Sequence, residues 1–221
     1  MDNIVTVDGP SGVGKGTLSQ WLCDKTQFTL LDSGAIYRAL AYGSIVENIN
    51  ETEVDKLVAL AERLPVSFEG VLVLYDGKDV TPQIRNEETA AVASKVAAIP
   101  EVREALLERQ KAFYNELLGL IADGRDMGSM VFPNAKVKLF LTASAKERAK
   151  RRVNQLKLQG VNAKIDQITR DIEQRDERDR NRSASPLVSA SDAIIIDTTS
   201  LSVEEVCQIA EKALWDNGIL K

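Results

Sequence analysis

The sequence of 221 residues contains no histidine and only two cysteines. Without histidine, Ser-His-Asp hydrolysis and zinc sites with histidine ligands are excluded. Cys23 and Cys207 are too few for a disulfide framework, so we expect free thiols in a reducing compartment. No run approaches the ~20 apolar residues that cross a bilayer, and the first residues lack the pattern of a signal peptide. These absences predict a cytoplasmic protein that does not bind membranes.

The sequence also has no excess of positive charge. Its 28 Lys and Arg residues are outnumbered by 33 Asp and Glu residues, which gives a net charge of −5. A protein that binds a nucleic acid polymer normally carries a basic surface, so we expect no such partner. A small anion such as a nucleotide needs only a local cluster of Arg or Lys, and the composition allows one.

Short apolar runs alternate with helical patterns along the chain. Continuous apolar runs are typical of parallel strands buried on both faces, so we expect an α/β fold with a parallel sheet flanked by helices. Residues 63–85 differ, because apolar runs on either side of short turns predict a small antiparallel β segment there. The strands of the parallel sheet are expected at residues 4–8, 120–123, 137–141 and 193–197, with a further apolar run at 28–31. Helices are expected at residues 15–26, 35–46, 86–98, 100–118 and 164–179, and after caps at Asn50 or Thr52 (to about Arg63), Ser144 and Ser202.

A glycine-rich loop follows the first expected strand and opens the first expected helix. Glycines let backbone N–H groups turn towards phosphate oxygens, the helix N-terminus adds positive potential, and Lys15 reaches the β- and γ-phosphates. Glycine at position 16 replaces the usual hydroxyl, which Thr17 supplies one place later. A turn without a ligand is the alternative. The predicted ATP-binding residues of the loop are Gly9, Pro10, Ser11, Gly12, Val13, Gly14, Lys15, Gly16 and Thr17.

Asp123 is the second chemical signal, because it ends the apolar run at residues 119–122. A carboxylate at the tip of such a strand can hold Mg²⁺ through water, as Walker-B residues do. We therefore predict Mg²⁺ as the cofactor that accompanies ATP, with Asp123 and Thr17 as its ligands through water. The alternative is a surface Asp-Gly turn.

Four stretches together resemble the bacterial cytidylate kinase family: residues 8–17, 31–38, 121–128 and 175–182. The resemblance implies a nucleoside monophosphate kinase that transfers the γ-phosphoryl group of ATP to CMP or dCMP. It implies a single P-loop α/β kinase domain, a monomer, with three moving parts. These are a core (residues 1–33, 104–149 and 167–221), a segment binding the nucleoside monophosphate (about 34–103, including the β segment 63–85) and a lid (about 150–166).

The resemblance also implies roles for individual side chains. Ser33, Arg38 and Arg125 are expected to contact the CMP phosphate. Ser94, Arg103 and Asp126 are expected to read the cytosine. Arg175 and Asp179 are expected to hold the ribose, with Arg175 and Arg182 near the phosphates. Tyr37 either packs in the core or lines the CMP site.

Phosphoryl transfer requires mainly positioning and neutralisation of charge, and arginines are suited to both. We predict that Arg148 and Arg152 bind ATP, and that Lys15, Asp123, Arg125 and Arg178 are catalytic. The helix face with Arg175, Arg178 and Arg182 has a second interpretation, a solvated surface with salt bridges.

Asp126 can accept a hydrogen bond from the 4-amino group of cytosine, whereas uracil presents a carbonyl there, so we expect CMP to be preferred. Asp126 as a mere partner of Arg125 or Arg103 is the alternative. The rival functions are a kinase for UMP or AMP, a P-loop switch protein, and a nucleotide-binding module without catalysis. The sequence lacks the Asn-Lys-x-Asp motif of GTPase switches.

Overall fold

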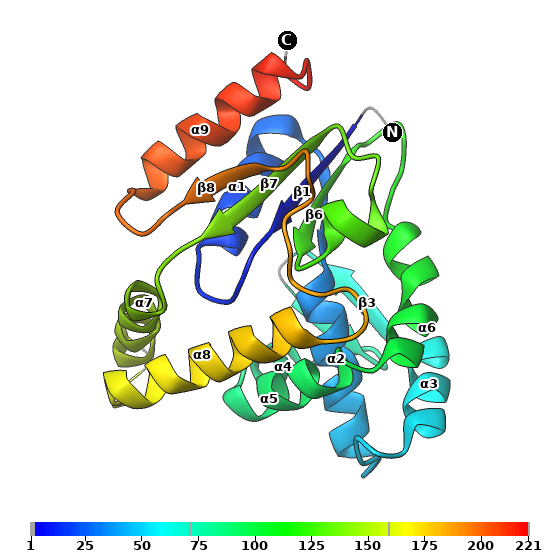
Figure 1. Cartoon of the computed structure of the whole chain (residues 1–221). Helices are drawn as coiled ribbons and strands as arrows, with labels where there is room; N and C mark the ends of the chain where they lie inside the picture. The colour runs from blue at the N-terminus through cyan, green and yellow to red at the C-terminus, as the bar shows by residue number, and fades with distance from the viewer. Residues whose placement is uncertain (1–2, 71, 159, 221) are drawn as a thin grey trace. The chain divides into compact units, whose positions relative to one another are not determined.

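The computed structural model describes residues 3–70, 72–158 and 160–220 (Figure 1). The chain divides into two compact units. The first unit comprises Met1–Leu31 and Phe113–Lys221, and the second comprises Asp32–Ala112. Among the described residues no helix is long and apolar enough to cross a membrane. Cys23 and Cys207 are free thiols, as expected.

A five-stranded sheet organises the first unit. Its order is β2-β6-β1-β7-β8, so β1 lies at the centre. The pairs β1–β6, β1–β7 and β7–β8 are parallel, which confirms the predicted α/β fold. The strands are β1 (Ile4–Asp8), β2 (Thr29–Asp32), β6 (Leu120–Gly124), β7 (Val137–Thr142) and β8 (Ile194–Asp197).

The sheet is not covered equally along its width. All five residues of β1 are buried, as a continuous apolar run predicts. The expectation of burial on both faces is wrong for β8, where Ile195 is 62% exposed. Since β8 is an edge strand with one neighbour, fewer elements pack against its faces.

Helices α1 and α9 bury the central strands. Helix α1 (Lys15–Thr26) packs against β1 and β6, and α9 (Val203–Asp216) packs against α1 and β7 (Figure 1). Leu22, Leu139 and Leu214 belong to the resulting apolar core. The expected capping box starts α9, because Ser202 and Glu205 exchange side-chain and backbone hydrogen bonds of 3.2 and 2.7 Å.

Two further helices of the first unit follow one another along the chain and pack together. They are α7 (Ala145–Leu158), capped by Ser144 as expected, and α8 (Ile165–Asn181), which extends two residues past the predicted end. The predicted lid, residues 150–166, covers the second half of α7 and the start of α8. Gln159, inside that range, lies outside the described residues.

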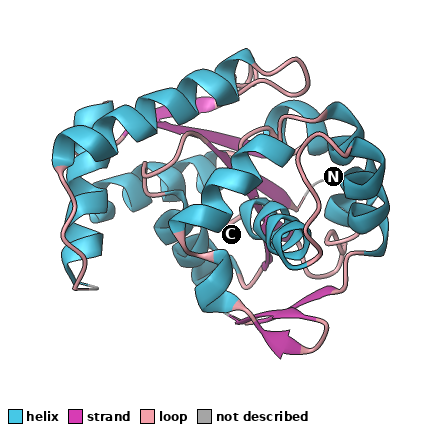
Figure 2. Cartoon of the chain, turned by 90° about the horizontal axis from the view of Figure 1, so that it is seen from below, coloured by secondary structure: helices cyan, strands magenta, loops and turns pink. Residues whose placement is uncertain are grey.

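The second unit holds a three-stranded antiparallel sheet, which confirms the β segment expected at residues 63–85 (Figure 2). Val71, the first residue of one expected strand, lies outside the described residues. The strands of this antiparallel sheet are β3 (Val66–Glu69), β4 (Leu72–Tyr75) and β5 (Lys78–Asp79). The helices of the second unit are α2 (Ser33–Val46), α3 (Val54–Arg63), α4 (Thr81–Ile84), α5 (Glu87–Val96) and α6 (Pro100–Lys111).

Several elements differ from the sequence prediction. Helix α6 ends at Lys111 instead of 118, and within the remaining residues the Asn115 side chain accepts from the Leu117 N–H, a local bond that competes with helix there. The N-cap of α3 is Glu53, whereas Asn50 and Thr52 lie in the preceding turn. A π-helical turn, η1 (Met127–Val131), was not expected.

Candidate active site

The glycine-rich loop joins the buried end of β1 to the first turn of α1. Gly9, Gly12 and Gly14 have φ angles of 143°, 79° and 97°, which side-chain-bearing residues rarely adopt. A Cβ atom on Gly9 would also collide with the carbonyl oxygen of Leu141 on β7. Gly16 is different, because no atom lies within 4 Å of the position its Cβ would take. The loop therefore needs glycine for its backbone at three positions and leaves open space at position 16.

Lys15 is the first residue of α1 and is almost fully buried. Its Nζ donates a 3.0 Å hydrogen bond to the carbonyl oxygen of Pro10, so the side chain folds back over its own loop. Burial, together with the nearby positive charge of Arg125, lowers the pKa of Lys15 to about 7. Asp123 and Asp8 oppose that shift with their negative charges. The structure thus brings Lys15, Asp123 and Arg125 into one electrostatic cluster.

Asp123 is anchored by a residue that the sequence did not single out. The buried hydroxyl of Ser19, one turn along α1 from Lys15, donates a 3.2 Å hydrogen bond to Asp123 Oδ2. Thr17, the predicted hydroxyl, is exposed. The described residues contain no cluster of three or more His, Cys, Asp or Glu side chains that could hold a metal ion. The oxygen donors available here are single carboxylate and hydroxyl groups.

Arg148, predicted to bind ATP, is buried and hydrogen-bonded to protein oxygens. Its Nε donates to Ala143 O at 3.1 Å, and Nη1 donates to Ser11 O at 3.1 Å. Both terminal nitrogens also contact the carboxylate of Asp176 on α8. Arg148 therefore fixes the glycine-rich loop against α7 and α8. Sequence reasoning missed Asp176, and its only signal was a carboxylate next to Arg175.

Two more arginines pair with carboxylates in the first unit. Arg125 Nε donates to Asp179 Oδ2 at 3.1 Å, and the side chain of Asp179 is only 8% exposed. Arg182 forms an ion pair of 3.9 Å with Asp126, with both side chains 4% exposed. These pairs join the segment after β6 to the end of α8. They bring together four of the residues predicted to bind CMP.

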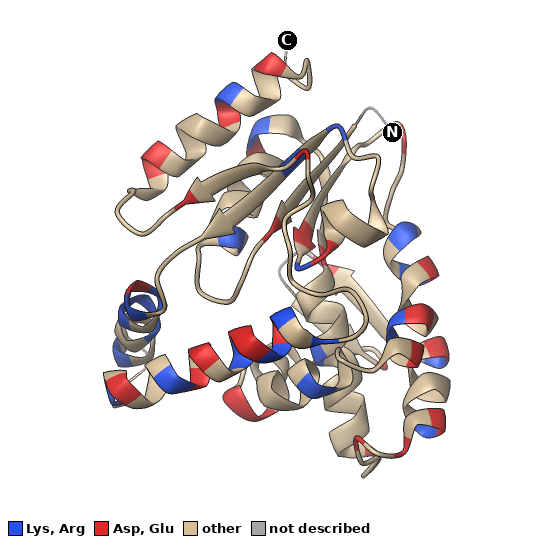
Figure 3. Cartoon of the chain, viewed as in Figure 1, with Lys and Arg blue, Asp and Glu red and all other residues tan. Residues whose placement is uncertain are grey.

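Helix α8 carries charges of both signs (Figure 3). Arg178 and Arg180 are exposed, whereas Asp176 and Asp179 are buried. The two buried acids pair with arginines outside this helix, Arg148 on α7 and Arg125 after β6. Arg175 is half-buried, and its charge acts on Lys15.

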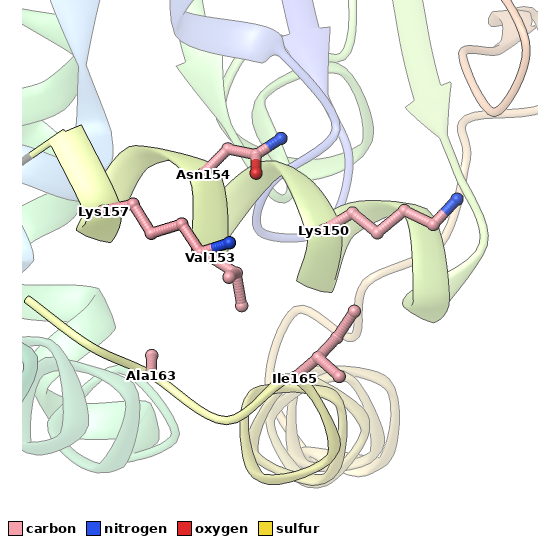
Figure 4. Close-up of a pocket in the computed structure, with 6 residues that line it drawn as sticks. All are labelled: Lys150, Val153, Asn154, Lys157, Ala163 and Ile165. Atoms are coloured by element: carbon pink, nitrogen blue, oxygen red, sulfur yellow. The ribbon is translucent and has the colours of Figure 1, made fainter.

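Two hollows lie beside these helices within the first unit. One, of about 390 Å³, is lined by the predicted lid (Figure 4). Figure 4 shows four side chains from α7 above two from the segment that enters α8: Lys150, Val153, Asn154, Lys157, Ala163 and Ile165. The other, of about 610 Å³, is bordered by Arg148 and Asp176. Arg152 of α7 donates to Gln155 at 2.7 Å.

The second unit holds the remaining predicted CMP-binding residues. Ser33 donates a 2.9 Å hydrogen bond to Gln110, and Arg38 donates at 3.0 Å to the carbonyl oxygen of Ile84. The Arg103 guanidinium lies 5.3 Å from the centre of the Tyr37 ring and donates to Ala97 O at 3.0 Å. Tyr37 therefore packs against another predicted residue. Ser94 is buried on α5.

Asp8 is a further residue that sequence reasoning missed. It is buried at the end of β1, and its carboxylate accepts hydrogen bonds from the N–H groups of Met127 and Gly128. Burial raises the pKa of Asp8 to about 7, although those two N–H groups act in the opposite direction. No local pattern indicated this contact, because the partners are about 120 residues apart.

Comparison with known proteins identifies this arrangement. A family model described as cytidylate kinase matches residues 5–214. The chain belongs to the cytidylate kinase family. The match includes every residue that we predicted for the site, which confirms the resemblance seen in the sequence motifs.

Individual members of the cytidylate kinase family are similar over nearly their whole length. A cytidylate kinase from Shewanella piezotolerans is 55% identical over 94% of this chain and 92% of the relative. One from Vibrio vulnificus is 54% identical over 96% of this chain and 93% of its own. One from Vibrio cholerae is 53% identical over 94% and 93%, respectively.

Proposed function

We propose that the chain transfers the γ-phosphoryl group of ATP to CMP or dCMP, giving ADP and CDP or dCDP. Membership of the cytidylate kinase family supports this reaction. Within the structure, the main support for this reaction is that two neighbouring strands, β1 and β6, end side by side. The glycine-rich loop follows β1, and Arg125 follows β6, with Asp8 opposite Gly124 in the parallel register. Ligands of open α/β sheets bind at the carboxyl ends of the strands.

The glycine-rich loop is proposed to hold the triphosphate. Gly9 to Thr17 present backbone N–H groups to the phosphate oxygens, and Lys15 exchanges its bond to Pro10 for the β- and γ-phosphates. Arg152 contributes positive charge from α7. Arg148 acts indirectly in this proposal, because its bonds to Ser11 and Asp176 fix the loop.

Mg²⁺ is the proposed companion of ATP. Mg²⁺ keeps several waters and is held by one or two carboxylates together with substrate phosphates, so a dense protein cluster is not needed. Asp123 and Thr17 fit that requirement through water, and Ser19 orients Asp123. The ion supplies neutralisation of phosphate charge when it is bound.

CMP is the proposed phosphoryl acceptor. Ser33, Arg38, Arg125, Arg175 and Arg182 are assigned to its phosphate, and Asp179 with Arg175 to its ribose. Ser94, Arg103 and Asp126 read the cytosine, while Tyr37 supports Arg103. In the reaction, a phosphate oxygen of CMP attacks the γ-phosphorus and the bond to the bridging oxygen of ADP breaks. Lys15, Arg125 and Arg178 stabilise the charge that develops.

A panel of nucleoside monophosphates with Mg-ATP tests this proposal. We expect kcat/KM for CMP and dCMP to exceed that for UMP and AMP by at least about tenfold, because a carbonyl facing Asp126 leaves a buried acceptor unpaired. Equal rates for UMP and CMP would refute the assignment of Asp126 and Arg103. Lys15→Met should abolish turnover while the fold is retained, and persistent turnover would refute the assigned role of Lys15.

A further inference from the structure

Asp8 connects the start of the glycine-rich loop to the turn that follows Arg125 and Asp126. Its Oδ1 accepts from the Met127 N–H at 2.9 Å, and its Oδ2 accepts from the Gly128 N–H at 2.8 Å. The side chain is thus held at both oxygens. Only 5% of the residue is exposed, so water does not compete for these bonds.

The two N–H groups belong to the first residues of η1. The N-cap of η1 is Asp126, and its own side chain makes no capping hydrogen bond there. Asp8 supplies that bond from a neighbouring strand. The carboxylate of Asp126 thereby remains directed to Arg182, with which it forms the 3.9 Å ion pair. The conformation of the 125–128 segment depends on a residue about 120 positions away.

Tight packing leaves this turn little freedom. A Cβ atom on Gly124 would lie 2.7 Å from Met127 Cγ, and one on Gly128 would lie 2.7 Å from Thr6 Oγ1. A side chain at either glycine position would therefore force the neighbouring side chain to move. A turn packed on both sides and anchored at two amides fixes the direction of the side chains that precede it, Arg125 and Asp126.

We infer that Asp8 is a positioning residue for the acceptor nucleotide: its carboxylate holds the Met127 and Gly128 amides and thereby orients Arg125 and Asp126 towards CMP. This inference rests on the proposed function. It assigns Asp8 a role in CMP recognition without contact to CMP.

The test compares Asp8→Asn with wild type and with a control, Val7→Ala. Asparagine keeps the size of the side chain but replaces one acceptor oxygen with an NH₂ group that faces an N–H. Val7 is the preceding residue of β1, and it is fully buried in the apolar core. Its truncation destabilises the same strand and leaves the Asp8 carboxylate in place. Thermal unfolding, ATP affinity and steady-state kinetics with CMP and UMP are measured for all three proteins.

We expect Asp8→Asn to raise KM for CMP at least about tenfold and to reduce the preference for CMP over UMP. Its ATP dissociation constant should remain within about threefold of wild type. Val7→Ala should lower the melting temperature while KM for CMP stays near the wild-type value. If Asp8→Asn leaves KM for CMP unchanged, or Val7→Ala raises it equally, the positioning role is overturned.

The amide resonances of Met127 and Gly128 give a readout that needs no substrate. Loss of one of the two hydrogen bonds in Asp8→Asn should shift at least one of these resonances upfield and speed its hydrogen exchange. Two unchanged resonances would overturn the inference even with altered kinetics. A wild-type protein that does not phosphorylate CMP would instead overturn the proposed function. The two failures are therefore distinguishable.

Discussion

We expect the chain to take up about one proton when it binds ATP at pH 8, and Lys15 to be the group that takes it up. In the structure the pKa of Lys15 is lowered to about 7, first by burial and then by the charge of Arg125. Triphosphate oxygens beside the Nζ atom favour the charged form and raise that pKa again. The binding of ATP is therefore accompanied by the uptake of a proton.

The size of the effect follows from the two protonation states. With a pKa of about 7, roughly one tenth of Lys15 is charged at pH 8 in the free protein. A bound pKa near the ordinary value of about 10.4 makes the group fully charged, so uptake is about 0.9 proton. By linkage, the association constant for ATP should fall about tenfold for each pH unit between pH 8 and pH 9.

Calorimetry of ATP binding at pH 8 in two buffers with different ionisation enthalpies measures this uptake. Lys15→Arg is the matched control, because arginine keeps the positive charge but does not deprotonate at these pH values. The variant should bind ATP with little proton uptake and a flat pH dependence. Wild-type uptake below about 0.2 proton would contradict the low pKa of Lys15. Equal uptake in wild type and Lys15→Arg would assign the proton to another group.

Three further outcomes are expected. Gly16→Ala should not lower the melting temperature, because the added methyl group meets no atom within 4 Å and alanine favours the helix. It should weaken ATP binding at least about tenfold, because the methyl group occupies the space proposed for the phosphates. Unchanged affinity in a titration would place the phosphates elsewhere. Arg125→Ala should reduce kcat about 100-fold or more. The unfolding free energy should fall by about 1–3 kcal/mol, because Asp179 loses its partner. A stability loss that accounts for the whole activity loss would argue against direct phosphate contact. Asp179→Ala should raise KM for CMP about tenfold, and identical KM values for variant and wild type would remove its ribose role.

Local patterns were sufficient to predict the elements nearest the chemistry. The bounds of β1 and α1 were predicted correctly, because an apolar run, a glycine-rich turn and a lysine at the helix start are contiguous. The capping box at Ser202 and the small antiparallel sheet were predictable for the same reason. Asn115 shows the limit, because its side-chain hydrogen bond to the Leu117 N–H competes with helix in a stretch whose sequence pattern is helical.

The site was predicted less completely than the fold. Arg125, Asp126, Asp179 and Arg182 were selected from motifs, but their mutual pairing was not. An arginine on a helix has the same sequence pattern whether it faces solvent or a buried acid. The full burial of Arg148 against Asp176 therefore could not be predicted.

By itself, the sequence determined the α/β class, the glycine-rich loop with Lys15 and the family to which the chain belongs. These depend on residues that are adjacent or one helical turn apart, so local sterics and hydrogen bonding specify them. Only the tertiary structure decided that Asp8 caps η1, that Ser19 anchors Asp123 and that burial lowers the pKa of Lys15. These features depend on the packing of strands and helices that are distant in the sequence, and on the removal of water from the charged groups that this packing buries.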